Sequence, residues 1–468
     1  MKIKYTNIVK KQRDFYNTNI TRDISFRKKA LLQLKNKMEE YEENLYEALE
    51  IDLNKNAKEA FLSEIGQVYD ELDLAIKKVN KWSKTKKVKS NYTTFGSKSG
   101  KVLLPRGLTF IISPFNYPVN LSLIPLISSI AAGNVAILKL SNLTPSTNSV
   151  LQNIIDESFK EEHVSVVSDQ NFKSFNDIYK EEIDFLFFTG STKTGKIIQQ
   201  KCVENDIPHI LELGGKSPTI VETGVDTQKH SLERIVWGKL LNAGQTCVAP
   251  DYFLVNEKIV ENFIENLKIE IQEQYPNVLE NNNLPKIINK DSFKRLEKIL
   301  KKYKDNIVFG GLTDKENLQI EPTIIYVEDS TEIKKTEEIF GPIFFISKYE
   351  NFSEAIQLIK EIDPNPLAAY LFTNNNIQIS HFVHEVNSLN IAINDVIVQI
   401  SNPNVPFGGI KTSGVGSYHG RFGFESFSLQ KNIMNKKWNT NLPLMFINKG
   451  TNLSKTRSLM RKFKKILR

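Results

Sequence analysis

Apolar side chains recur at one spacing up to about residue 90 and at another beyond it. Between residues 22 and 90 they return every three or four positions, as in FRKKALLQLKNKMEEYEENLYEALE, which predicts amphipathic helices. Residues 91–107 replace this spacing with NYTTFGSKSGKVLLPRG, which predicts a strand pair around a glycine-bearing turn. From residue 108 onward, short apolar runs alternate with helical segments.

This alternation predicts strands and helices in turn. Strands are expected over 108–113, 135–140 and 183–190, and helices over 121–133, 146–159 and the residues that follow Gly190. A second series starts near Pro208, with a helix through RIVWGKLLNAG, a strand at YFLVN and a helix over 257–274, and it continues to about residue 400. Such alternation is typical of parallel sheets, so we expect an α/β fold with two α/β domains that join in the region 208–215.

Composition is that of a globular protein. Of the 468 residues, 40% are hydrophobic and 25% charged, which excludes a disordered or fibrous chain. Two cysteines, Cys202 and Cys247, cannot form a disulfide framework, so we expect free thiols in a reducing compartment. The most apolar stretch, residues 121–138, is interrupted by polar residues and predicts buried structure instead of a membrane span. The start of the chain has no signal-peptide core, so the protein is expected to be soluble and cytoplasmic.

The net charge of +8 is concentrated near the C-terminus. From Lys449 onward there are eight basic residues and no acidic ones, which leaves the rest of the chain near neutrality. We therefore expect no nucleic-acid partner. Residues 454–468, SKTRSLMRKFKKILR, place apolar side chains at helical spacing among basic ones. Two interpretations stay open: a basic amphipathic helix on an anionic membrane surface, or a helix that packs its apolar stripe on the protein's own body or on a second subunit.

One cysteine has a setting that suggests chemistry. Cys247 lies in Gly244-Gln245-Thr246-Cys247-Val248, after a predicted helix and before the strand DYFLV, where a chain reversal can present it to a site. A thiolate is a strong nucleophile toward a carbonyl carbon. Taken alone, the setting of Cys247 favours a packed core cysteine over a nucleophile, and Cys202, on a predicted helix, is expected to be a core cysteine.

Six motifs, taken together, resemble those of the aldehyde dehydrogenase superfamily. They are Pro114-Phe115-Asn116-Tyr117-Pro118, Phe188-Thr189-Gly190-Ser191-Thr192, Glu212-Leu213-Gly214-Gly215-Lys216, Gly244-Gln245-Thr246-Cys247, Glu338-Ile339-Phe340-Gly341-Pro342 and Pro406-Phe407-Gly408-Gly409. The resemblance covers about residues 20 to 435. The string QTCVAPDY and the ending Tyr418-His419-Gly420 with Gly423-Phe424 are most similar to the class 3 branch, which includes fatty aldehyde dehydrogenases.

The resemblance implies three catalytic residues. Cys247 would attack the aldehyde, and Asn116 would donate its side-chain amide to the oxyanion together with the Cys247 backbone N–H. After hydride transfer has left a thioester, Glu212 would activate the water that releases the carboxylic acid. By their local sequence alone, Asn116 could be a turn residue and Glu212 a solvated strand end.

The resemblance also implies an NAD(P) cofactor and no metal. Gly190, Ser191 and Gly195 lie between a strand and a helix, where N–H groups can bind a pyrophosphate. Lys139 would contact the adenosine ribose, and Glu338, with Phe340 packed beside it, would hold the nicotinamide ribose. Where the family often has a glutamate that repels a 2′-phosphate, this chain has Asn142, so NAD is expected and NADP could be tolerated.

The remaining expectations concern substrate and assembly. Tyr117 and Phe407 would line an apolar tunnel for medium or long-chain aliphatic, aromatic or polyene aldehydes, or they are ordinary core residues. The resemblance implies an NAD(P)-binding domain (1–90 and 108–211), a catalytic domain (212–400) and a bridging element (91–107 and 420–436) that pairs subunits in a homodimer, followed by the tail (449–468). Two alternative functions are a coenzyme A-acylating dehydrogenase and a non-catalytic membrane-surface scaffold.

Overall fold

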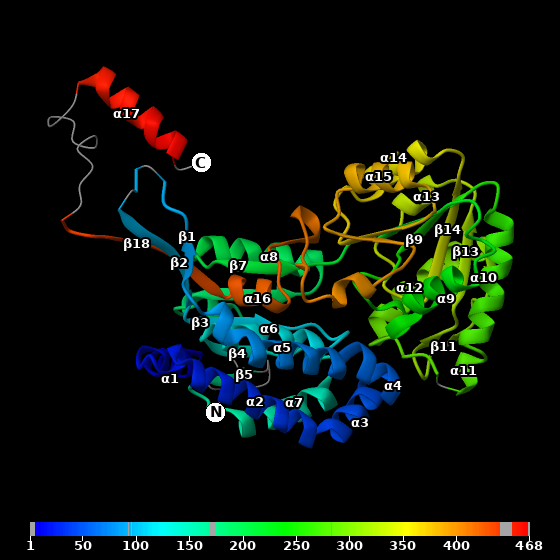
Figure 1. Cartoon of the computed structure of the whole chain (residues 1–468). Helices are drawn as coiled ribbons and strands as arrows, with labels where there is room; N and C mark the ends of the chain where they lie inside the picture. The colour runs from blue at the N-terminus through cyan, green and yellow to red at the C-terminus, as the bar shows by residue number, and fades with distance from the viewer. Residues whose placement is uncertain are drawn as a thin grey trace.

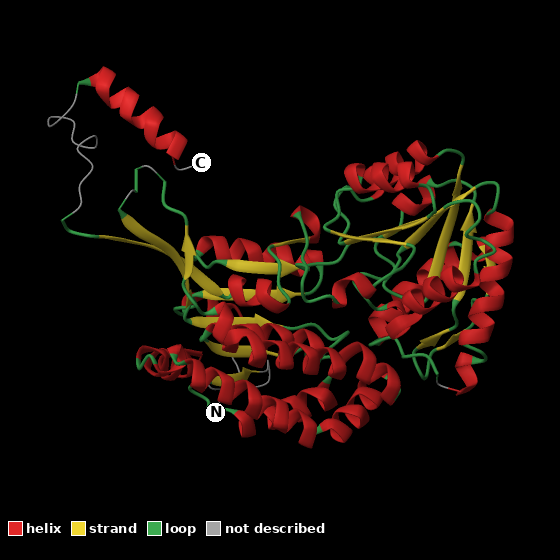
Figure 2. Cartoon of the chain, in the orientation of Figure 1, coloured by secondary structure: helices red, strands yellow, loops and turns green. Residues whose placement is uncertain are grey.

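Two large sheets, each packed with helices, make up most of the molecule (Figures 1 and 2). The computed structural model describes residues 5–91, 93–94, 96–167, 175–281, 283–439 and 452–466. Five of the six strands of one sheet and six of the seven strands of the other run parallel. The predicted α/β class is confirmed.

Helices dominate the N-terminal part of the chain, as predicted up to Trp82. They are α1 (Tyr5–Asn17), η1 (Ile20–Arg22), α2 (Ile24–Glu40), α3 (Glu42–Leu53), α4 (Ala57–Ala60), the π-helical turn η2 (Phe61–Ile65) and α5 (Gly66–Trp82). Helix α1 was not predicted from the sequence. The predicted helical region also extends too far, because β1 (Lys86–Val88) is already a strand, paired with the strand that follows it.

The first large sheet has the strand order β17-β7-β6-β3-β4-β5. Its strands are β3 (Leu108–Ile112), β4 (Val135–Lys139), β5 (Val164–Val167), β6 (Phe185–Thr189), β7 (His209–Glu212) and the antiparallel edge β17 (Gly414–Val415). The connecting helices are α6 (Asn120–Ala132), α7 (Pro145–Ser158), η3 (Phe175–Lys180) and α8 (Thr192–Glu204). Strand side chains alternate between faces: Leu108 and Phe110 pack in the core that contains α1 and α8, whereas Ile111 packs in the other core.

The direction of winding reverses between β3 and β6. From β3 the chain proceeds to β4 and β5 on one side, and it then crosses to β6 and β7 on the other. The connections that leave the carboxyl ends of β3 and β6 therefore diverge and leave space between them, which is where ligands bind in open α/β sheets. Motif residues 114–118 follow β3, and Gly190 follows β6.

The second large sheet has the order β10-β13-β14-β9-β8-β15-β16. Its strands are β8 (Pro218–Val221), β9 (Tyr252–Asn256), β10 (Ile307–Phe309), β13 (Thr323–Val327), β14 (Ile343–Tyr349), β15 (Ala368–Phe372) and β16 (Asn390–Ile393), and β11 (Thr313–Asp314) and β12 (Gln319–Ile320) form a separate ribbon. The helices are α9 (Lys229–Leu240), η4 (Leu241–Gly244), α10 (Val260–Gln274), α11 (Val278–Asn281), α12 (Lys290–Lys302), η5 (Lys304–Asn306), α13 (Thr331–Lys334), α14 (Phe352–Ile362), α15 (Asn376–Glu385), η6 (Val398–Ser401) and η7 (Lys411–Ser413).

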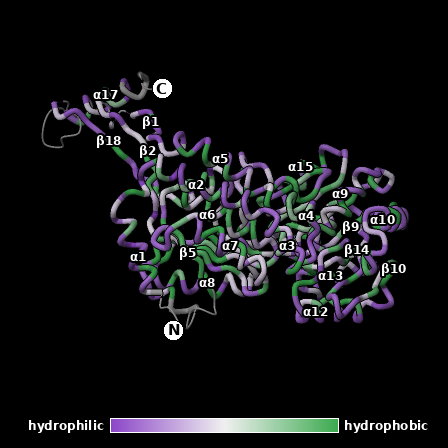
Figure 3. The backbone as a smooth tube through the Cα atoms, turned by 90° about the horizontal axis from the view of Figure 1, so that it is seen from below, coloured by the Kyte–Doolittle hydropathy of each residue, from purple (hydrophilic) through white to green (hydrophobic). Residues whose placement is uncertain are grey.

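A three-stranded antiparallel arm projects from the first sheet (Figure 1). It consists of β1, β2 (Ser97–Pro105) and β18 (Ser428–Lys436), which follows α16 (Gly420–Ser426). The prediction of a strand pair inside 91–107 was wrong in its first strand, because β2 pairs with β1 on one side and with the distant β18 on the other. The side chains of β18 are mostly exposed and hydrophilic (Figure 3).

The C-terminal helix α17 (Leu453–Ile466) stands away from both large sheets (Figures 1 and 3). Between Leu453 and Lys462 every side chain is exposed or half-buried, so this described part of the helix is not buried in the body of its own chain. The tail residues 449–451, 467 and 468 lie outside the described residues, as do the side chains of 463–466. In the described part of the chain, no helix combines the length and apolar character needed to cross a bilayer.

A buried ion pair joins the N-terminal helices to the connection between β3 and α6. Lys55 Nζ lies 2.6 Å from Glu64 Oε1, and both side chains are fully buried. Lys55 also donates to the carbonyl oxygen of Asn116 (2.9 Å), and Glu64 Oε2 accepts from the Val119 N–H (2.8 Å). These four groups satisfy one another, so the charges fix the path of the segment that carries Asn116.

Removing one partner of this pair will destabilise the fold. We expect Glu64→Gln to lower the free energy of unfolding by about 3–5 kcal/mol, because the Lys55 ammonium then stays buried without a counter-charge. Urea denaturation followed by circular dichroism measures the change. The exposed pair Lys201–Glu204 provides the control, and Glu204→Gln should leave the urea midpoint unchanged. Equal midpoints for Glu64→Gln and wild type would contradict this assignment.

Candidate active site

A strained turn presents Cys247. After α9, residues Asn242, Ala243 and Gly244 all have left-handed backbone angles, with φ of 54°, 53° and 73°. Two consecutive non-glycine residues in this conformation cost on the order of 1–2 kcal/mol each. At Gly244 a Cβ atom would lie 2.3 Å from the carbonyl oxygen of Gly341, so no other residue fits. The turn thus ties the cysteine loop to the loop that contains Glu338.

Hydrogen bonds hold the cysteine loop against the segment that carries Asn116. The Asn116 side-chain amide donates to the Gln245 carbonyl oxygen (3.0 Å), and the Asn242 amide donates to the Asn116 carbonyl oxygen (2.8 Å). Glu59 accepts from the Asn242 N–H (2.6 Å). Asn116 is 4% exposed, so these contacts are shielded from water. The structure therefore brings Asn116 and Cys247, which are far apart in sequence, to one place.

The Cys247 side chain is half-buried, and the charges of two carboxyl groups act on its thiol. Burial raises the pKa of the Cys247 thiol to about 12, and the carboxylates of Glu338 and Glu212 add to the rise, whereas the N–H groups of Cys247 and Val248 oppose it. Cys202 lies fully buried in α8, as expected for a core cysteine, and burial alone raises its pKa to about 12. Only Cys247 has acidic neighbours that contribute to its pKa.

Glu212 ends β7 and is 2% exposed. Neither of its carboxyl oxygens has a hydrogen-bonding partner among the described residues. Burial raises the pKa of Glu212 well above its usual value, because it keeps water away from the charged form. A buried carboxyl that no described residue satisfies, and whose charge acts on a thiol, is suited to exchanging protons with a substrate or a water molecule.

Glu338 approaches the Cys247 loop from the second sheet. A Cβ atom at Gly214 would lie 2.4 Å from Glu338 Oε2, so a glycine is required for the carboxyl to come this close. The Gly215 N–H donates to this carboxyl, but burial and the charge of Asp251 raise the pKa of Glu338 to about 8. Arg295 donates to the carbonyl oxygens of Glu338 (2.9 Å) and Ile339 (2.6 Å) and fixes the loop.

Phe340 follows Glu338 and Ile339 in the same loop. Phe340 has a positive φ of 45°, and its ring meets that of Phe115 edge-on at 6.2 Å between centroids. Asp251 accepts from the Ile339 N–H (2.7 Å) and pairs with Lys216 (3.0 Å). Lys216 and Asp251 therefore connect two sequence motifs, Glu212–Lys216 and Glu338–Pro342.

The predicted dinucleotide residues lie at the carboxyl edge of the first sheet. The Gly190 N–H donates to the Glu212 carbonyl oxygen (3.0 Å), and Ser191 caps α8 by accepting from the Thr194 N–H (3.3 Å). At Gly195 a Cβ atom would meet the Leu213 side chain at 2.3 Å, so glycine lets α8 lie close to the strand end. A helix N-terminus at the point where the sheet reverses its winding fits a pyrophosphate.

Lys139 and Asn142 lie further along the same edge. Lys139 ends β4, which is paired in register with β3, and its carbonyl oxygen accepts from the Ser113 N–H (3.0 Å). Asn142 is exposed three residues later. The strands β3 and β6 separate β4 from β7 in the sheet, so Lys139 and Glu212 end strands on opposite sides of the winding reversal.

Tyr117 and Phe407 are both buried, and Tyr117 contacts the cysteine loop. The Tyr117 hydroxyl lies 2.5 Å from Thr246 Oγ1, and Lys55 Nζ lies 4.2 Å from the centre of its ring. Phe407 packs against Tyr418, with ring centroids 5.9 Å apart. Burial raises the pKa of Tyr418, and the charges of Glu212 and Cys247 act in the same direction, so Tyr418 belongs to the same group of residues.

Several residues that shape the site were not predicted from the sequence. Lys55, Glu59, Glu64 and Asn242 contact the Asn116 segment or the turn before Cys247. The apolar periodicity assigns Glu59 and Glu64 to an amphipathic helix, on which charged residues normally face solvent. The one available signal was the Asn-Ala-Gly sequence before the cysteine, because asparagine and glycine tolerate left-handed backbone better than other residues.

Comparison with known proteins identifies the chain. Residues 5–433 match the model described as the aldehyde dehydrogenase family. The chain belongs to this family. The predicted resemblance is confirmed, and with it an NAD(P)-dependent enzyme that oxidises an aldehyde.

Individual relatives support the class 3 branch of the aldehyde dehydrogenases. The chain is 40% identical over 423 residues to 4,4'-diaponeurosporen-aldehyde dehydrogenase of Staphylococcus aureus, covering 90% of this chain and 92% of the relative. It is 35% identical over 433 residues to aldehyde dehydrogenase family 3 member H1 of Arabidopsis thaliana (92% and 89%). It is 34% identical over 432 residues to the "dimeric NADP-preferring" aldehyde dehydrogenase of Rattus norvegicus (92% and 94%).

A solved structure extends the likeness to three dimensions. The substrate-bound state of Staphylococcus aureus AldH superposes with a TM-score of 0.91 at 36% sequence identity, covering 99% of this chain and 100% of the other. The aldehyde dehydrogenase fold is thereby established for the whole arrangement of sheets and arm.

The raised pKa of Cys247 can be tested by alkylation. In the cofactor-free enzyme we expect the rate of iodoacetamide modification to rise about tenfold per pH unit from about pH 7 to about pH 10, because only the thiolate reacts. Mass spectrometry on Cys202→Ala isolates the signal of Cys247, and Cys247→Ala gives the background. A rate that levels off below about pH 9 would show that the thiol ionises far more easily than its surroundings indicate.

Proposed function

We propose that this aldehyde dehydrogenase converts an apolar aldehyde to its carboxylic acid through a thioester on Cys247, with Glu212 as the hydrolytic base. The observation that supports this most directly is the buried carboxyl of Glu212, which has no hydrogen-bonding partner among the described residues and whose charge acts on the Cys247 thiol. A role in proton transfer accounts for a carboxyl in that position.

The first step joins the thiol to the substrate. Once the thiol has lost its proton, Cys247 Sγ attacks the carbonyl carbon, and the carbonyl oxygen takes the negative charge of the thiohemiacetal. One hydrogen of the Asn116 amide is used by Gln245, and its second hydrogen is left for this oxyanion, beside the Cys247 N–H. One such donor contributes about 3 kcal/mol to the transition state.

The cofactor would be held along the carboxyl edge of the first sheet. Gly190, Ser191 and Gly195 would face the pyrophosphate, with Lys139 at the adenosine ribose and Glu338 and Phe340 at the nicotinamide ribose. When bound, NAD(P) supplies a hydride acceptor, which leaves the thioester on Cys247. The close approach of Glu338 to Gly214 supports this assignment, because it brings that carboxyl to the end of the first sheet, near the thiol.

Hydrolysis then regenerates the enzyme. Glu212 in its carboxylate form takes a proton from water, the hydroxide oxygen attacks the thioester carbon, and the C–S bond breaks to give the carboxylic acid and the Cys247 thiolate. Because the pKa of Glu212 is raised, this step speeds up as the pH rises toward that pKa. A coenzyme A-acylating enzyme would instead release an acyl-CoA and would not need Glu212.

An apolar substrate is supported by the relatives and by the residues around the thiol. The Staphylococcus aureus relative is named for 4,4'-diaponeurosporen-aldehyde, a polyene aldehyde. In this chain Tyr117 contacts Thr246 beside the thiol, the Tyr418 hydroxyl interacts electrostatically with Cys247, and the ring of Phe407 packs on that of Tyr418. We therefore assign a long apolar aldehyde, with Tyr117 and Phe407 along its path.

The proposed enzyme is a cytoplasmic homodimer. The arm exposes Leu429, Ile433 and Met434 on β18, between 44% and 57% accessible, which a second subunit would cover. The rat relative is named as dimeric. In this arrangement residues 1–90 and 108–211 bind the cofactor, 212–400 complete the catalytic site, and 91–107 with 420–436 pair the subunits.

Two variants test the mechanism. We expect Cys247→Ala to form no NAD(P)H from decanal, and Glu212→Gln to form one equivalent per active site before turnover falls by about 10²–10⁴-fold, because the thioester is no longer hydrolysed. Stopped-flow absorbance measures the burst, and mass spectrometry detects the acyl-enzyme. Cys202→Ala, in the core, is the control and should turn over normally. Continued turnover by Glu212→Gln with coenzyme A present would favour the acylating alternative.

The cofactor preference is tested at Asn142. We propose that the wild type uses NAD and tolerates NADP, and that Asn142→Glu lowers kcat/KM for NADP by about tenfold, because a carboxylate several ångströms from the 2′-phosphate repels it. Steady-state kinetics with both cofactors measure the effect, and kcat/KM for NAD serves as the internal control. Equal losses with the two cofactors would show that Asn142 does not lie near the 2′-position.

A further inference from the structure

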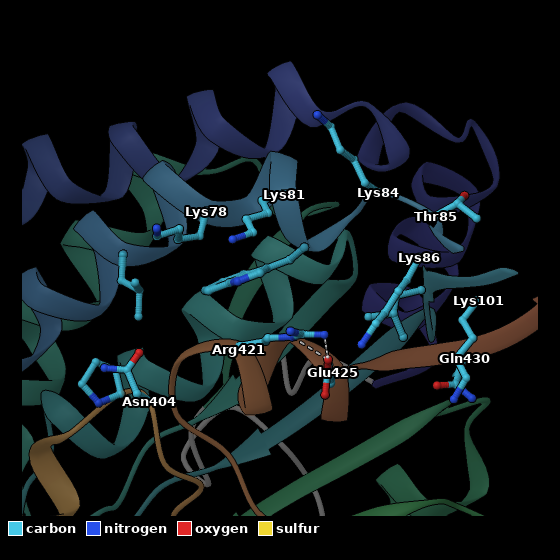
Figure 4. A pocket seen from close by; sticks show the side chains of 14 residues that line it. Lys78, Lys81, Lys84, Thr85, Lys86, Lys101, Asn404, Arg421, Glu425 and Gln430 are labelled. Carbon is cyan, nitrogen blue, oxygen red and sulfur yellow. Dashed lines mark hydrogen bonds and ion pairs between the residues drawn. The ribbon is translucent and has the colours of Figure 1, made fainter. Parts of the chain in front are cut away.

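A basic recess lies where the arm leaves the first sheet. It encloses about 780 Å³ between the C-terminal end of α5, the strands β1 and β2, and α16 (Figure 4). Its basic side chains are Lys78, Lys81, Lys84, Lys86, Lys101 and Arg421. Trp82 and Leu103 supply apolar surface within it. Basic side chains around the apolar surface of Trp82 and Leu103 can bind an anionic headgroup.

The lysines of this recess have no carboxylate partners in the described part of the chain. Arg421 pairs with Glu425 (2.7 Å), the one acidic residue among the described residues that line the recess. Elsewhere on the surface many lysines are paired, as in Lys35–Asp73 and Lys37–Glu157. Five like charges gathered without counter-charges repel one another, so an external anion would stabilise them.

The recess backs onto the active site. Glu71 of α5 accepts from the Gly420 N–H (3.0 and 3.1 Å), and Gly420 follows Tyr418 by two residues. A Cβ atom at Gly420 would meet Leu74 and Pro403, which both line the recess. One face of α5 therefore supports the Tyr418 segment, and its C-terminal end carries Lys78 and Lys81 into the recess.

The C-terminal helix adds a second basic surface near the arm. α17 combines basic residues with an apolar stripe, and its described side chains are exposed or half-buried. Between the arm and this helix, Trp438 is fully exposed beside Lys437. In Figure 1, α17 lies on the same side of the molecule as β1, β2 and β18. Basic residues mixed with exposed tryptophan are typical of proteins that lie at a bilayer interface.

We propose that the recess binds phosphate headgroups of anionic phospholipids and, together with α17, seats the enzyme on a bilayer surface. Each basic residue near such a surface contributes attraction that falls off within a Debye length. The flat lipid surface suits an open recess and an exposed helix at once, whereas a free phosphate compound would occupy the recess alone. Lys101, Leu103 and Arg421 belong to the element proposed above to pair subunits, so the recess must stay open in the dimer for this proposal to hold. The proposal does not depend on the identity of the aldehyde or on the catalytic roles given above.

The test uses sedimentation of the full-length enzyme with vesicles. We expect binding to vesicles that contain phosphatidylglycerol and none to phosphatidylcholine alone. The triple variant Lys81→Gln/Lys84→Gln/Lys101→Gln should bind about 100-fold more weakly, since three charges are lost at about 1 kcal/mol each. The matched control Lys294→Gln/Lys298→Gln/Lys301→Gln removes three exposed lysines from α12 and should bind as wild type does.

Further measurements distinguish this proposal from the alternatives. A third variant, Lys455→Gln/Arg457→Gln/Arg461→Gln, tests the contribution of α17. If this variant loses vesicle binding while the recess variant binds normally, the recess is not the lipid-binding site. Calorimetric binding of inorganic phosphate or pyrophosphate without vesicle binding would assign the recess to a free anion. A change in mass of the recess variant by light scattering would assign it to a subunit contact. Oxidation of propanal at wild-type rate by every variant shows that each is folded and active.

Discussion

The buried Lys55–Glu64 pair is the interaction on which the geometry of the site depends. It holds the connection between β3 and α6, and that connection supplies Asn116, whose backbone and side chain fix the turn before Cys247. An ion pair taken out of water contributes little net stability compared with apolar packing, but its partners tolerate few alternative positions. The main effect of the pair is therefore to fix the position of the segment that carries Asn116, and not to stabilise the fold. The left-handed strain at Asn242 and Ala243 persists because these bonds leave the turn no other path.

The electrostatics of the site follow from burial. Glu212, Glu338 and Cys247 come from three separate segments, and burial raises the pKa of each because it excludes water from the charged form. Burial therefore disfavours the charged form of all three groups, and a positive charge that entered beside them would lower each pKa. Because only the thiolate reacts readily, the raised pKa of Cys247 lowers the reactivity of this thiol toward oxidation and alkylation.

Sequence alone predicted the parallel-sheet architecture and most strands of the first sheet, because short apolar runs there alternate regularly with helices. The motifs also joined Asn116, Glu212, Cys247 and Glu338 in one hypothesis, although these residues lie far apart along the chain.

The features that were not predicted depend on contacts between distant segments. Lys55 and Glu64 are like any charged residues of a helix until folding buries them together. The apolar pattern did not pair β18 with β2 across more than three hundred residues, although the resemblance placed 91–107 and 420–436 in one element. The near-neutral charge of residues 1–448 also concealed a local excess, although the run KWSKTKKVKS was visible at residues 81–90.

That local excess changes how the net charge is understood. In the summed charge of residues 1–448, the lysines at the end of α5 are cancelled by acidic residues elsewhere in the chain. An approaching charged surface, however, interacts only with charges within about 10 Å at ordinary ionic strength. What matters for docking is therefore the arrangement of Lys78, Lys81 and Lys101 around one opening, and not the total. The same helix that places two of these lysines also supports, through Glu71, the segment that brings Tyr418 against the active site. Because Glu71 and two of these lysines belong to one helix, a shift of α5 would act on the recess and, through the bond to Gly420, on the Tyr418 segment together.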